Sequence, residues 1–247
     1  MSVLGVSEVR WKGQGEIRSG DYSGGERAER GVAIVVHKSL VRSVVKKIVC
    51  SERIIALNLK AEPVSILIMQ VYIPTLEYED DEVEKLYDTT EEILEEDGEG
   101  DTNNIIVGDW NSVVGDELYR NIVGSHGLGR RNHRGQMLID FCERNGLIVT
   151  NTSFKKPRRR RLYTWKAPGD WGRHQLDYIL MKHQFRNSVK DVPGADIDSD
   201  HNLLVDKIRT RLKKIIRFQN SRPRWDLEKL YAQRQSAGHS RRGTRCN

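Results

Sequence analysis

An acid and an amide stand one residue apart at the end of an apolar run in the middle of the chain. The run is Ile105–Val107, and Gly108, Asp109, Trp110 and Asn111 follow it. Continuous β-branched residues indicate a strand buried on both faces. We interpret Gly108 as permitting a sharp exit from that strand, after which Asp109 and Asn111 point the same way. A carboxylate suits a hard divalent cation and an amide N–H suits a phosphoryl oxygen, although an Asx turn would also explain the pair.

Two more polar residues close apolar runs nearer the N-terminus. Glu8 ends the run that begins at Val3, where an exposed glutamate at a loop start is the simpler interpretation. Tyr72 lies two residues before Pro74, which forces an extended residue before it and ends sheet pairing. Tyr72 is therefore expected at a strand end, with a rim aromatic as the simpler alternative.

An acid and an Asp–His pair lie in the last third of the chain. Asp177 is inside the apolar run Gln175–Leu180, where a carboxylate is costly unless it has a partner. Asp200 and His201 precede a predicted final core strand at Asn202–Val205. In such a pair one group takes a metal or a proton and the other polarises a phosphate, but Asp–His pairs also occur by chance in loops.

A dense basic run precedes a Leu-Tyr-Thr-Trp segment. It favours either a phosphate-contacting loop or a nuclear address, and a solvated basic loop explains it equally well. The residues that we expect to contact DNA are Lys155, Lys156, Arg158, Arg159, Arg160, Arg161 and Trp165.

These residues need a scaffold of strands and helices to bring them together. Apolar patterns predict strands at residues 31–36, 54–59, 64–73, 147–152, 162–165 and 175–180, and helices at 79–96 and 135–145. The first helix has one apolar stripe, so its many acids are most simply a solvated face. Gly146 is placed to cap the second helix in the left-handed conformation.

Composition narrows the class of protein. The 247 residues give a net charge of +6, with 37% hydrophobic and 31% charged residues. This balance permits a polyanionic partner such as DNA. The 3 cysteines are scattered without disulfide or zinc spacing, which fits an intracellular, reducing compartment. No apolar run is long enough for a membrane span, so we expect no membrane partner, and nothing in the sequence sets the oligomeric state.

The order of these pieces is more specific than any one of them. A strand ending in Ser-Glu is followed by Tyr-x-Pro, Gly-Asp-x-Asn, Tyr-Thr-Trp, Leu-Asp-Tyr-Ile-Leu and Ser-Asp-His, each beside a predicted strand. From residue 3 to residue 205 this order resembles the endonuclease/exonuclease/phosphatase superfamily. Within it, the chain is most similar to the endonuclease domains of LINE-type retrotransposons, including craniofacial development protein 2-like relatives.

The resemblance implies an α+β fold, a four-layer α/β/β/α sandwich with two mixed sheets and with the family's first core strand missing. It implies a domain at residues 1–211 and a basic, largely disordered tail at 212–247. It also implies Mg²⁺-dependent nicking of DNA, with Mn²⁺ as another usable ion, in the nucleus. The alternative is a catalytically weak or dead remnant that binds nucleic acid or a protein through the same fold.

The resemblance also assigns roles to the residues at the cation. Glu8 corresponds to the principal Mg²⁺ ligand, and Asp200 lies near the metal. Asp109 corresponds to the acid that activates the attacking water and also faces the metal. These three carboxylates are therefore expected to share one pocket.

The remaining roles concern the phosphate. Asn111 corresponds to the amide that steadies a phosphoryl oxygen, and Tyr72 to the phenol near the scissile phosphate. His201 corresponds to the histidine that contacts the phosphate, and Asp177 to the acid that orients it. The chain departs from the family pattern in two places. Thr75 stands where the family has a second asparagine. The family's first strand, whose asparagine lies beside the metal, is missing.

Overall fold

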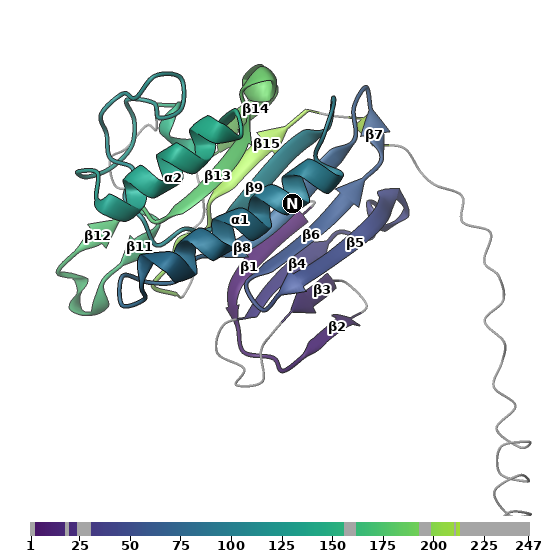
Figure 1. Cartoon of the computed structure of the whole chain (residues 1–247), viewed down its shortest axis with the longest axis horizontal. Helices are drawn as coiled ribbons and strands as arrows, with labels where there is room; N and C mark the ends of the chain where they lie inside the picture. Colours follow the sequence, from purple (N-terminus) through teal and green to yellow (C-terminus); the bar gives the residue numbers. More distant parts are fainter. Residues whose placement is uncertain are drawn as a thin grey trace, which may run out of the picture. The chain divides into compact units, whose positions relative to one another are not determined.

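The computed structural model describes residues 3–17, 20–23, 31–155, 162–192, 199–209 and 211–212. By its internal contacts the chain divides into Met1–Ile215 and Ile216–Asn247, and the second unit lies outside the described residues. The predicted boundary at residues 211/212 stays a prediction. Everything below concerns the first unit (Figure 1).

A mixed sheet of 6 strands is the centre of this unit, in the order β10-β13-β9-β8-β6-β5. Its strands are β5 (Val44–Ser51), β6 (Ile54–Leu59), β8 (Ile66–Tyr72), β9 (Asn103–Asp109), β10 (Leu147–Val149) and β13 (Asp177–Lys182). β8 and β9 are parallel, and their neighbours pair antiparallel.

The register of the central strands places three predicted site residues side by side. Tyr72 on β8 is level with Asp109 on β9, and Asp109 is level with Asp177 on β13. The ends of β8 and β9 and the start of β13 therefore lie at one edge of the sheet.

Gly108 has a different role from the one that we predicted. It lies within β9, and a Cβ at this position would collide with the carbonyl oxygen of Val71 on the neighbouring strand. Its φ is not in the left-handed region, so the glycine serves the close approach of two strands and makes no sharp turn.

Two helices cover one face of this sheet. α1 (Asp80–Asp97) buries an apolar stripe and leaves its acids toward solvent, as predicted. α2 (His133–Arg144) begins at Asn132, whose side-chain Oδ1 accepts a hydrogen bond of 2.7 Å from the backbone N–H of Gly135. Gly146 follows α2 with φ +61°, which confirms the predicted left-handed cap. Within the described residues, neither helix combines the length and apolar character that a membrane span requires.

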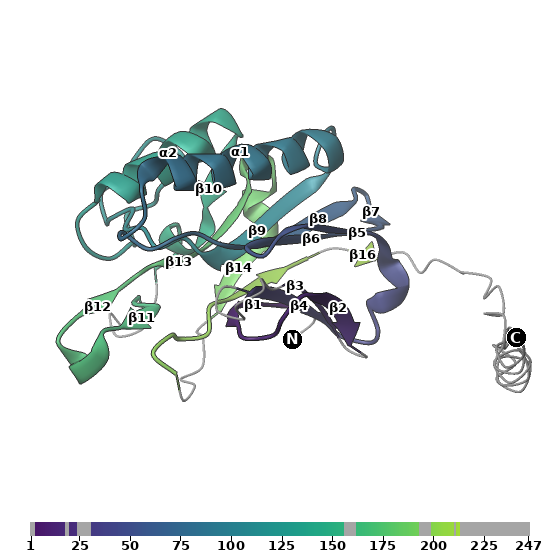
Figure 2. The same ribbon diagram turned by 60° about the horizontal axis from the view of Figure 1, so that its bottom comes forward.

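A second sheet faces the other side of the first (Figure 2). It has 4 strands in the order β1-β4-β3-β2, with bounds β1 (Val3–Val9), β2 (Gln14–Ile17), β3 (Gly20–Ser23) and β4 (Gly31–Val36). Apolar residues of β4, such as Ile34, pack against Leu57 and Ile68 of the first sheet, so strands such as β6 and β8 are buried on both faces. This confirms the predicted α+β sandwich.

Two details of that prediction are corrected. The described pairings of the smaller sheet are all antiparallel, so only the 6-stranded sheet is mixed. The prediction also had a layer of helices on each sheet. Within the described residues, the two helices long enough to form a layer, α1 and α2, both lie on the 6-stranded sheet. β1 is an edge strand of the 4-stranded sheet, and among the described strands it pairs only with β4.

The remaining elements are short. They are β7 (Ala61–Glu62), β11 (Trp165–Lys166), β12 (Arg173–His174), β14 (Val189–Val192), β15 (Val205–Ile208), β16 (Arg211–Leu212) and the short 3-10 helices η1 (Val41–Ser43), η2 (Thr150–Thr152), η4 (Pro168–Asp170) and η5 (His183–Ser188). The last predicted strand was placed too early, because residues 202–204 are irregular and β15 begins at Val205.

Candidate active site

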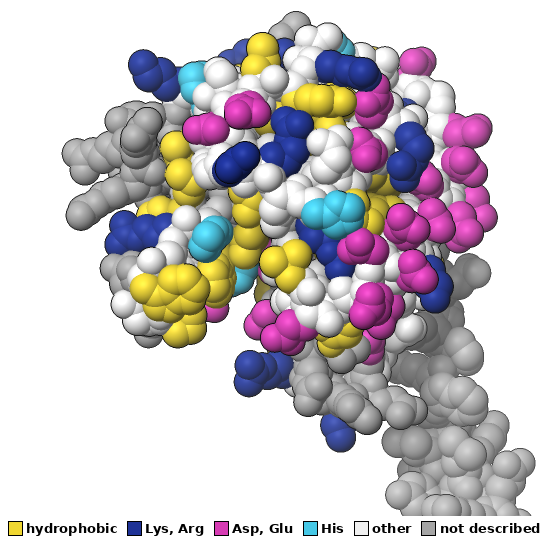
Figure 3. Space-filling view, turned by 60° about the vertical axis from the view of Figure 1, so that its left-hand side comes forward, with side chains coloured by type: hydrophobic (Ala, Val, Ile, Leu, Met, Phe, Trp, Pro, Cys, Tyr) yellow, Lys and Arg dark blue, Asp and Glu magenta, His cyan; other side chains and the backbone are white. Residues whose placement is uncertain are grey.

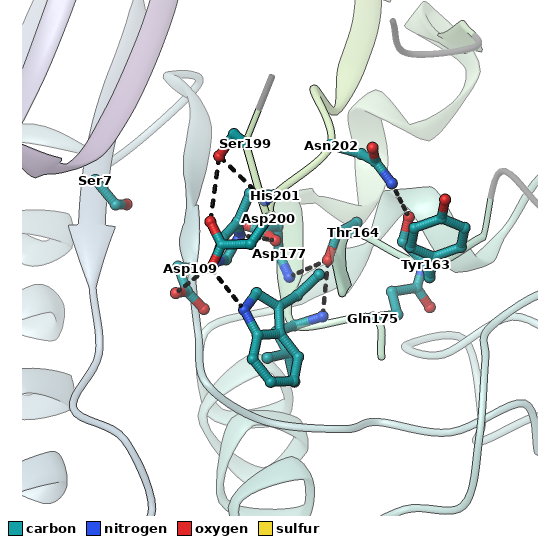
Figure 4. A network of polar contacts seen from close by, with 12 residues as sticks. Ser7, Asp109, Tyr163, Thr164, Gln175, Asp177, Ser199, Asp200, His201 and Asn202 are labelled. Atoms are coloured by element: carbon teal, nitrogen blue, oxygen red, sulfur yellow. Dashed lines mark hydrogen bonds and ion pairs between the residues drawn. The ribbon is translucent and has the colours of Figure 1, made fainter. Parts of the chain in front are cut away.

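Three side chains converge at the edge of the 6-stranded sheet (Figure 4). Asp109 ends β9, Asp177 begins β13, and His201 lies in the segment before β15. The His201 Nδ1 is 3.0 Å from the Asp177 Oδ2, and the His201 Nε2 is 4.0 Å from the Asp109 Oδ2. One ligand atom from each of the three lies within 4.8 Å of the others.

Asp109 is held in place by the residue that the sequence pairs with it. Its Oδ1 accepts a 3.0 Å hydrogen bond from the backbone N–H of Asn111, which is the Asx turn weighed above. The Asn111 side-chain Nδ2 donates to the carbonyl oxygen of Ile73 at 2.8 Å and lies 3.3 Å from the Asp109 Oδ2. Asn111 has φ +44°, an uncommon conformation for a residue other than glycine, so this tight turn carries strain.

The environment of Asp109 disfavours its charge. Only 3% of the residue is exposed. Burial, and then the neighbouring Asp177 carboxylate, raise the pKa of Asp109 to about 8. Nearby His201 acts in the opposite direction but does not outweigh them.

His201 has the opposite shift. Burial acts to lower its pKa, but the hydrogen bond and charge of Asp177, and then the charge of Asp109, raise the pKa of His201 to about 9. The imidazolium therefore persists at neutral pH, and both ring nitrogens are donors. Nδ1–H is directed to Asp177, and Nε2–H is directed toward Asp109.

Thr164 connects Asp177 to the segment that carries His201. Its Oγ1 accepts hydrogen bonds of 2.9 Å from the backbone N–H groups of Leu176 and Asp177. Its backbone carbonyl accepts from the N–H of Asn202 at 2.7 Å. We did not single out Thr164 as a site residue, although it stands in the Tyr-Thr-Trp motif.

The smaller sheet reaches this edge through β1. The Tyr72 hydroxyl donates to the Glu8 Oε1 at 3.1 Å, and the buried Gln70 donates from Nε2 to the Ser7 Oγ at 2.9 Å. Burial, followed by the charge of Glu8, raises the pKa of Tyr72 above its ordinary value, so the phenol stays neutral. Glu8 itself is exposed, with φ +58° at a bulge in β1.

Asp200 lies beside His201 in the chain but turns to a different partner. Its Oδ2 accepts from the indole N–H of Trp165 at 3.1 Å, and its Oδ1 is 3.2 Å from the Ser199 Oγ. Partial burial acts to raise the pKa of Asp200, but the Trp165 hydrogen bond and His201 hold it below its ordinary range. A bridge between the backbones of Trp165 and His201 keeps the two segments together.

The predicted residues thus fall into two groups. Asp109, Asp177 and His201 form one close cluster, with Asn111 bound to it. Glu8 and Asp200 flank this cluster without entering its closest set, and their metal roles stay predictions. Among the predicted DNA contacts, Lys155 is exposed and Trp165 is half-buried. Lys156 and Arg158–Arg161 lie outside the described residues.

The chemistry of this edge fits a hard divalent cation. Even beside the His201 imidazolium, burial and the Asp177 carboxylate keep the pKa of Asp109 raised, and a cation bound here would favour its ionised form. Carboxylate oxygens are also the protein ligands that Mg²⁺ prefers, and Glu8 and Asp200 could supply more of them. On the face of the molecule in Figure 3, acidic side chains also gather to one side. α1 also carries many acids on its solvated face. Among the described residues, the candidate metal-binding group does not include any acid of α1.

Comparisons with known proteins agree with this geometry. The endonuclease/exonuclease/phosphatase family model matches residues 2–201. Craniofacial development protein 2 of Bos taurus and that of Tragulus javanicus are each 39% identical over 223 residues, which is 87% of this chain. The match covers 37% and 38% of those proteins, so the chain spans well under half of their length.

Solved structures show the same fold at low identity. The endonuclease domain of TRAS1, a telomere-specific non-LTR retrotransposon, superposes with a TM-score of 0.58 at 16% identity, covering 84% of this chain and 86% of that one. The catalytic domain of Xenopus laevis APE2 superposes with a TM-score of 0.59 at 13% identity, covering 87% and 86%. With the family model matching most of its length, the chain belongs to the endonuclease/exonuclease/phosphatase family.

Proposed function

We propose that this chain is a nicking endonuclease of retrotransposon origin that hydrolyses phosphodiester bonds in DNA with Mg²⁺. The observation that carries the proposal is the Asp109–His201–Asp177 cluster, in which a buried carboxylate faces an imidazolium oriented by a second carboxylate. Among the structural neighbours, one is a retrotransposon endonuclease domain and another is a 3′ phosphatase bound to a DNA hairpin product.

The residues of the cluster divide the chemistry between them. Asp109 takes the proton of the attacking water at its Oδ2 as the new P–O bond forms. The P–O bond to the leaving sugar oxygen breaks on the opposite side of the phosphorus, and that oxygen takes a proton from solvent. His201 donates from Nε2 to a non-bridging oxygen of the phosphate, where negative charge increases in the transition state. Asp177 keeps the imidazole charged and fixes its plane. Asn111 contacts the same phosphate through its Nδ2, which gives up its long 3.3 Å contact with the Asp109 Oδ2 to do so.

Glu8, Asp109 and Asp200 are the carboxylates that would hold the ion. Bound there, Mg²⁺ or Mn²⁺ would offset the charge of the phosphodiester and of the water that attacks it. Asp109 must be ionised to accept a proton, and its raised pKa makes that unfavourable without a cation nearby.

The distribution of basic residues supports DNA as the partner over a smaller phosphate ester. The chain has a net charge of +6 despite the acidic face of α1, and its densest basic run is Lys155–Arg161. A polyanionic strand can contact many such residues at once, whereas a headgroup or nucleotide cannot. The same run supports a nuclear location.

One observation favours the alternative of a binding module without catalysis. Glu8 and Asp200 lie outside the closest ligand set, and Thr75 offers a hydroxyl where the family has an amide. The chain would then bind DNA through the same surface without cleaving it.

Conversion of supercoiled plasmid to the nicked form separates the two functions. We expect nicking with Mg²⁺, none with a chelator, and a loss of nicking in Asp109→Asn with unchanged folding. DNA binding that weakens steeply with salt, without cleavage at any Mg²⁺ or Mn²⁺ concentration, would establish the binding module instead.

A further inference from the structure

The single-turn helix η2 lies next to the Asp109–His201–Asp177 cluster. It hydrogen-bonds to β13, which begins with Asp177, and to β15, which follows His201. It follows β10 directly, and Thr150 and Asn151 are 1% and 0% exposed. The hydrogen bonds of their side chains described here do not go to Asp109 or His201.

Asn151 takes over where the backbone of β10 stops pairing with β13. The ladder runs from Leu147 to Val149 and ends opposite Leu180. Beyond it, the Asn151 Nδ2 donates to the carbonyl oxygen of Asp177 at 3.1 Å, and its Oδ1 accepts from the N–H of Ile179 at 3.3 Å. One side-chain amide thus supplies the donor and the acceptor that a strand residue would supply.

The side-chain amide of Asn151 helps to fix Asp177 from both sides. On one side Asp177 is level with Asp109 in the β9–β13 ladder. On the other side, the N–H of Asp177 donates to Thr164 and its carbonyl oxygen accepts from Asn151, which stands in for the missing backbone of β10. Without Asn151, the carbonyl oxygen of Asp177 and the N–H of Ile179 would lose these partners, and the carboxylate of Asp177 would be less restricted.

Thr150 connects the same strand to the segment that carries His201. Its hydroxyl is 2.9 Å from the carbonyl oxygen of Ile179 and 2.6 Å from the Oδ2 of Asp206. Asp206 lies on β15, which pairs with β14 in a separate sheet of 2 strands. Among the described strands, no ladder joins β15 to the 6-stranded sheet, and Thr150 is a polar link between them.

We propose that Thr150 and Asn151 are positioning residues, a clamp that holds β13 and β15 at the spacing in which Asp177 orients His201. The clamp acts through Asp177 and touches neither substrate nor metal. Its effect on cleavage rests on the proposed function, whereas its effect on His201 does not.

Isosteric replacements test the clamp at each residue. Thr150→Val removes the hydroxyl at constant shape, and Thr150→Ser keeps it. Asn151→Leu removes the amide, and Asn104→Leu is its matched control. Asn104 is equally buried and donates to the carbonyl oxygen of Gly98 at 3.1 Å, but it lies at the far end of β9.

Two measurements are made on these four variants. In the nicking assay, we expect Thr150→Val and Asn151→Leu to lower kcat about 10–100-fold with little change in KM, and Thr150→Ser to stay near wild type. In the metal-free protein at a fixed pH, ¹H–¹⁵N NMR should show the His201 Nδ1–H exchanging faster with water in the same two variants, because its hydrogen bond to Asp177 is weakened. Asn104→Leu should lower thermal stability without either effect.

The result that would overturn the proposal is an unchanged exchange rate of the His201 Nδ1–H in a folded Thr150→Val protein, or equal effects from Asn104→Leu and Asn151→Leu. If Asn151→Leu does not fold, the Thr150→Val and Thr150→Ser pair decides alone. If wild type does not nick DNA, the proposed function fails, and the exchange rate of the His201 Nδ1–H still tests the clamp.

Discussion

The two sheets bring very different halves to the candidate site. The half on the 6-stranded sheet is centred on the buried Asp109, with Asp177 fixed beside it by strand pairing and His201 held between them, both half-buried. The half on the 4-stranded sheet ends at an exposed Glu8 and reaches across by the Tyr72–Glu8 and Gln70–Ser7 hydrogen bonds. The first half is set by the fold, and the second is joined to it by two side-chain contacts.

The difference indicates which half of the site lowers the stability of the fold. Bringing Asp109 beside Asp177 in a buried place costs stability, because it forces a carboxylate to keep its proton at neutral pH. Glu8 is exposed to water. We therefore expect the buried half to control chemistry and pH dependence, and the exposed half to control the affinity for the ion.

The largest expected effect is at the centre of the buried half. Asp109→Asn should lower the nicking rate by about 10²–10⁴-fold, because the amide cannot take the proton of the attacking water. The same change removes a buried ionisable group, so the metal-free variant should melt at or above the temperature of wild type at pH 8. Nicking assays and thermal melts of the purified proteins measure both.

Asp140→Asn is the matched control for this change. Asp140 is an exposed acid on α2 whose partner is Gln136, one turn away. It should change neither nicking nor melting. Nicking by Asp109→Asn at the wild-type rate would mean that the buried half does not perform the chemistry.

The exposed half is tested by Glu8→Gln. This variant keeps an oxygen that can accept from Tyr72 but removes the charge that attracts a cation. We expect the Mg²⁺ concentration for half-maximal nicking to rise at least about tenfold, the scale found for residues that only support metal ligands. Melting without metal should be unchanged. If Glu8→Gln needed no more Mg²⁺ than wild type, Glu8 would lose its assignment as the principal ligand.

The buried half was also the more predictable half. The β-branched run before Asp109 and the Ser-Asp-His order pointed to strand ends, and the antiparallel register then brought Asp177 beside Asp109. Thr164 and Asn151 were missed because each acts by bonding a distant backbone group, which residue type does not reveal. β5 was missed because its exposed valines and lysines suit an edge strand and form no clear alternation. β2 and β3 were missed because their glycine-rich, polar sequence is typical of a loop.

The pH dependence of stability offers a sharper comparison of the halves. Asp109 has its pKa raised from 3.8 to about 8, so its contribution lowers stability progressively as pH rises between these values. His201 has its pKa raised from 6.5 to about 9, so the stability that it adds is complete below pH 6.5 and is lost as pH rises to 9. Both act in one direction, and the metal-free protein should lose stability from pH 6.5 to 9.

Thermal melts without metal measure this loss, at about 2–4 °C for each kcal/mol. Asp109→Asn should show a shallower decline, because only the His201 contribution remains. Glu8→Gln should keep most of the decline, because the charge of Glu8 is the smallest of the causes that raise the pKa of Asp109. A melting temperature that does not change between pH 6.5 and 9 would contradict the buried-charge interpretation.

The smallest expected effect is at Asp200, which lies between the halves. Trp165→Phe keeps an aromatic ring beside His174 but removes the indole N–H that binds the Asp200 carboxylate. The pKa of Asp200 should then rise, because this hydrogen bond is a main cause of its lowering. If Asp200 supports the ion, the Mg²⁺ requirement for nicking should change by about 2–10-fold, the value of one hydrogen bond. A change in the melting temperature with an unchanged Mg²⁺ requirement would place Asp200 with the structural contacts of the β11–β12 hairpin, and the ion would then depend on Glu8 and Asp109.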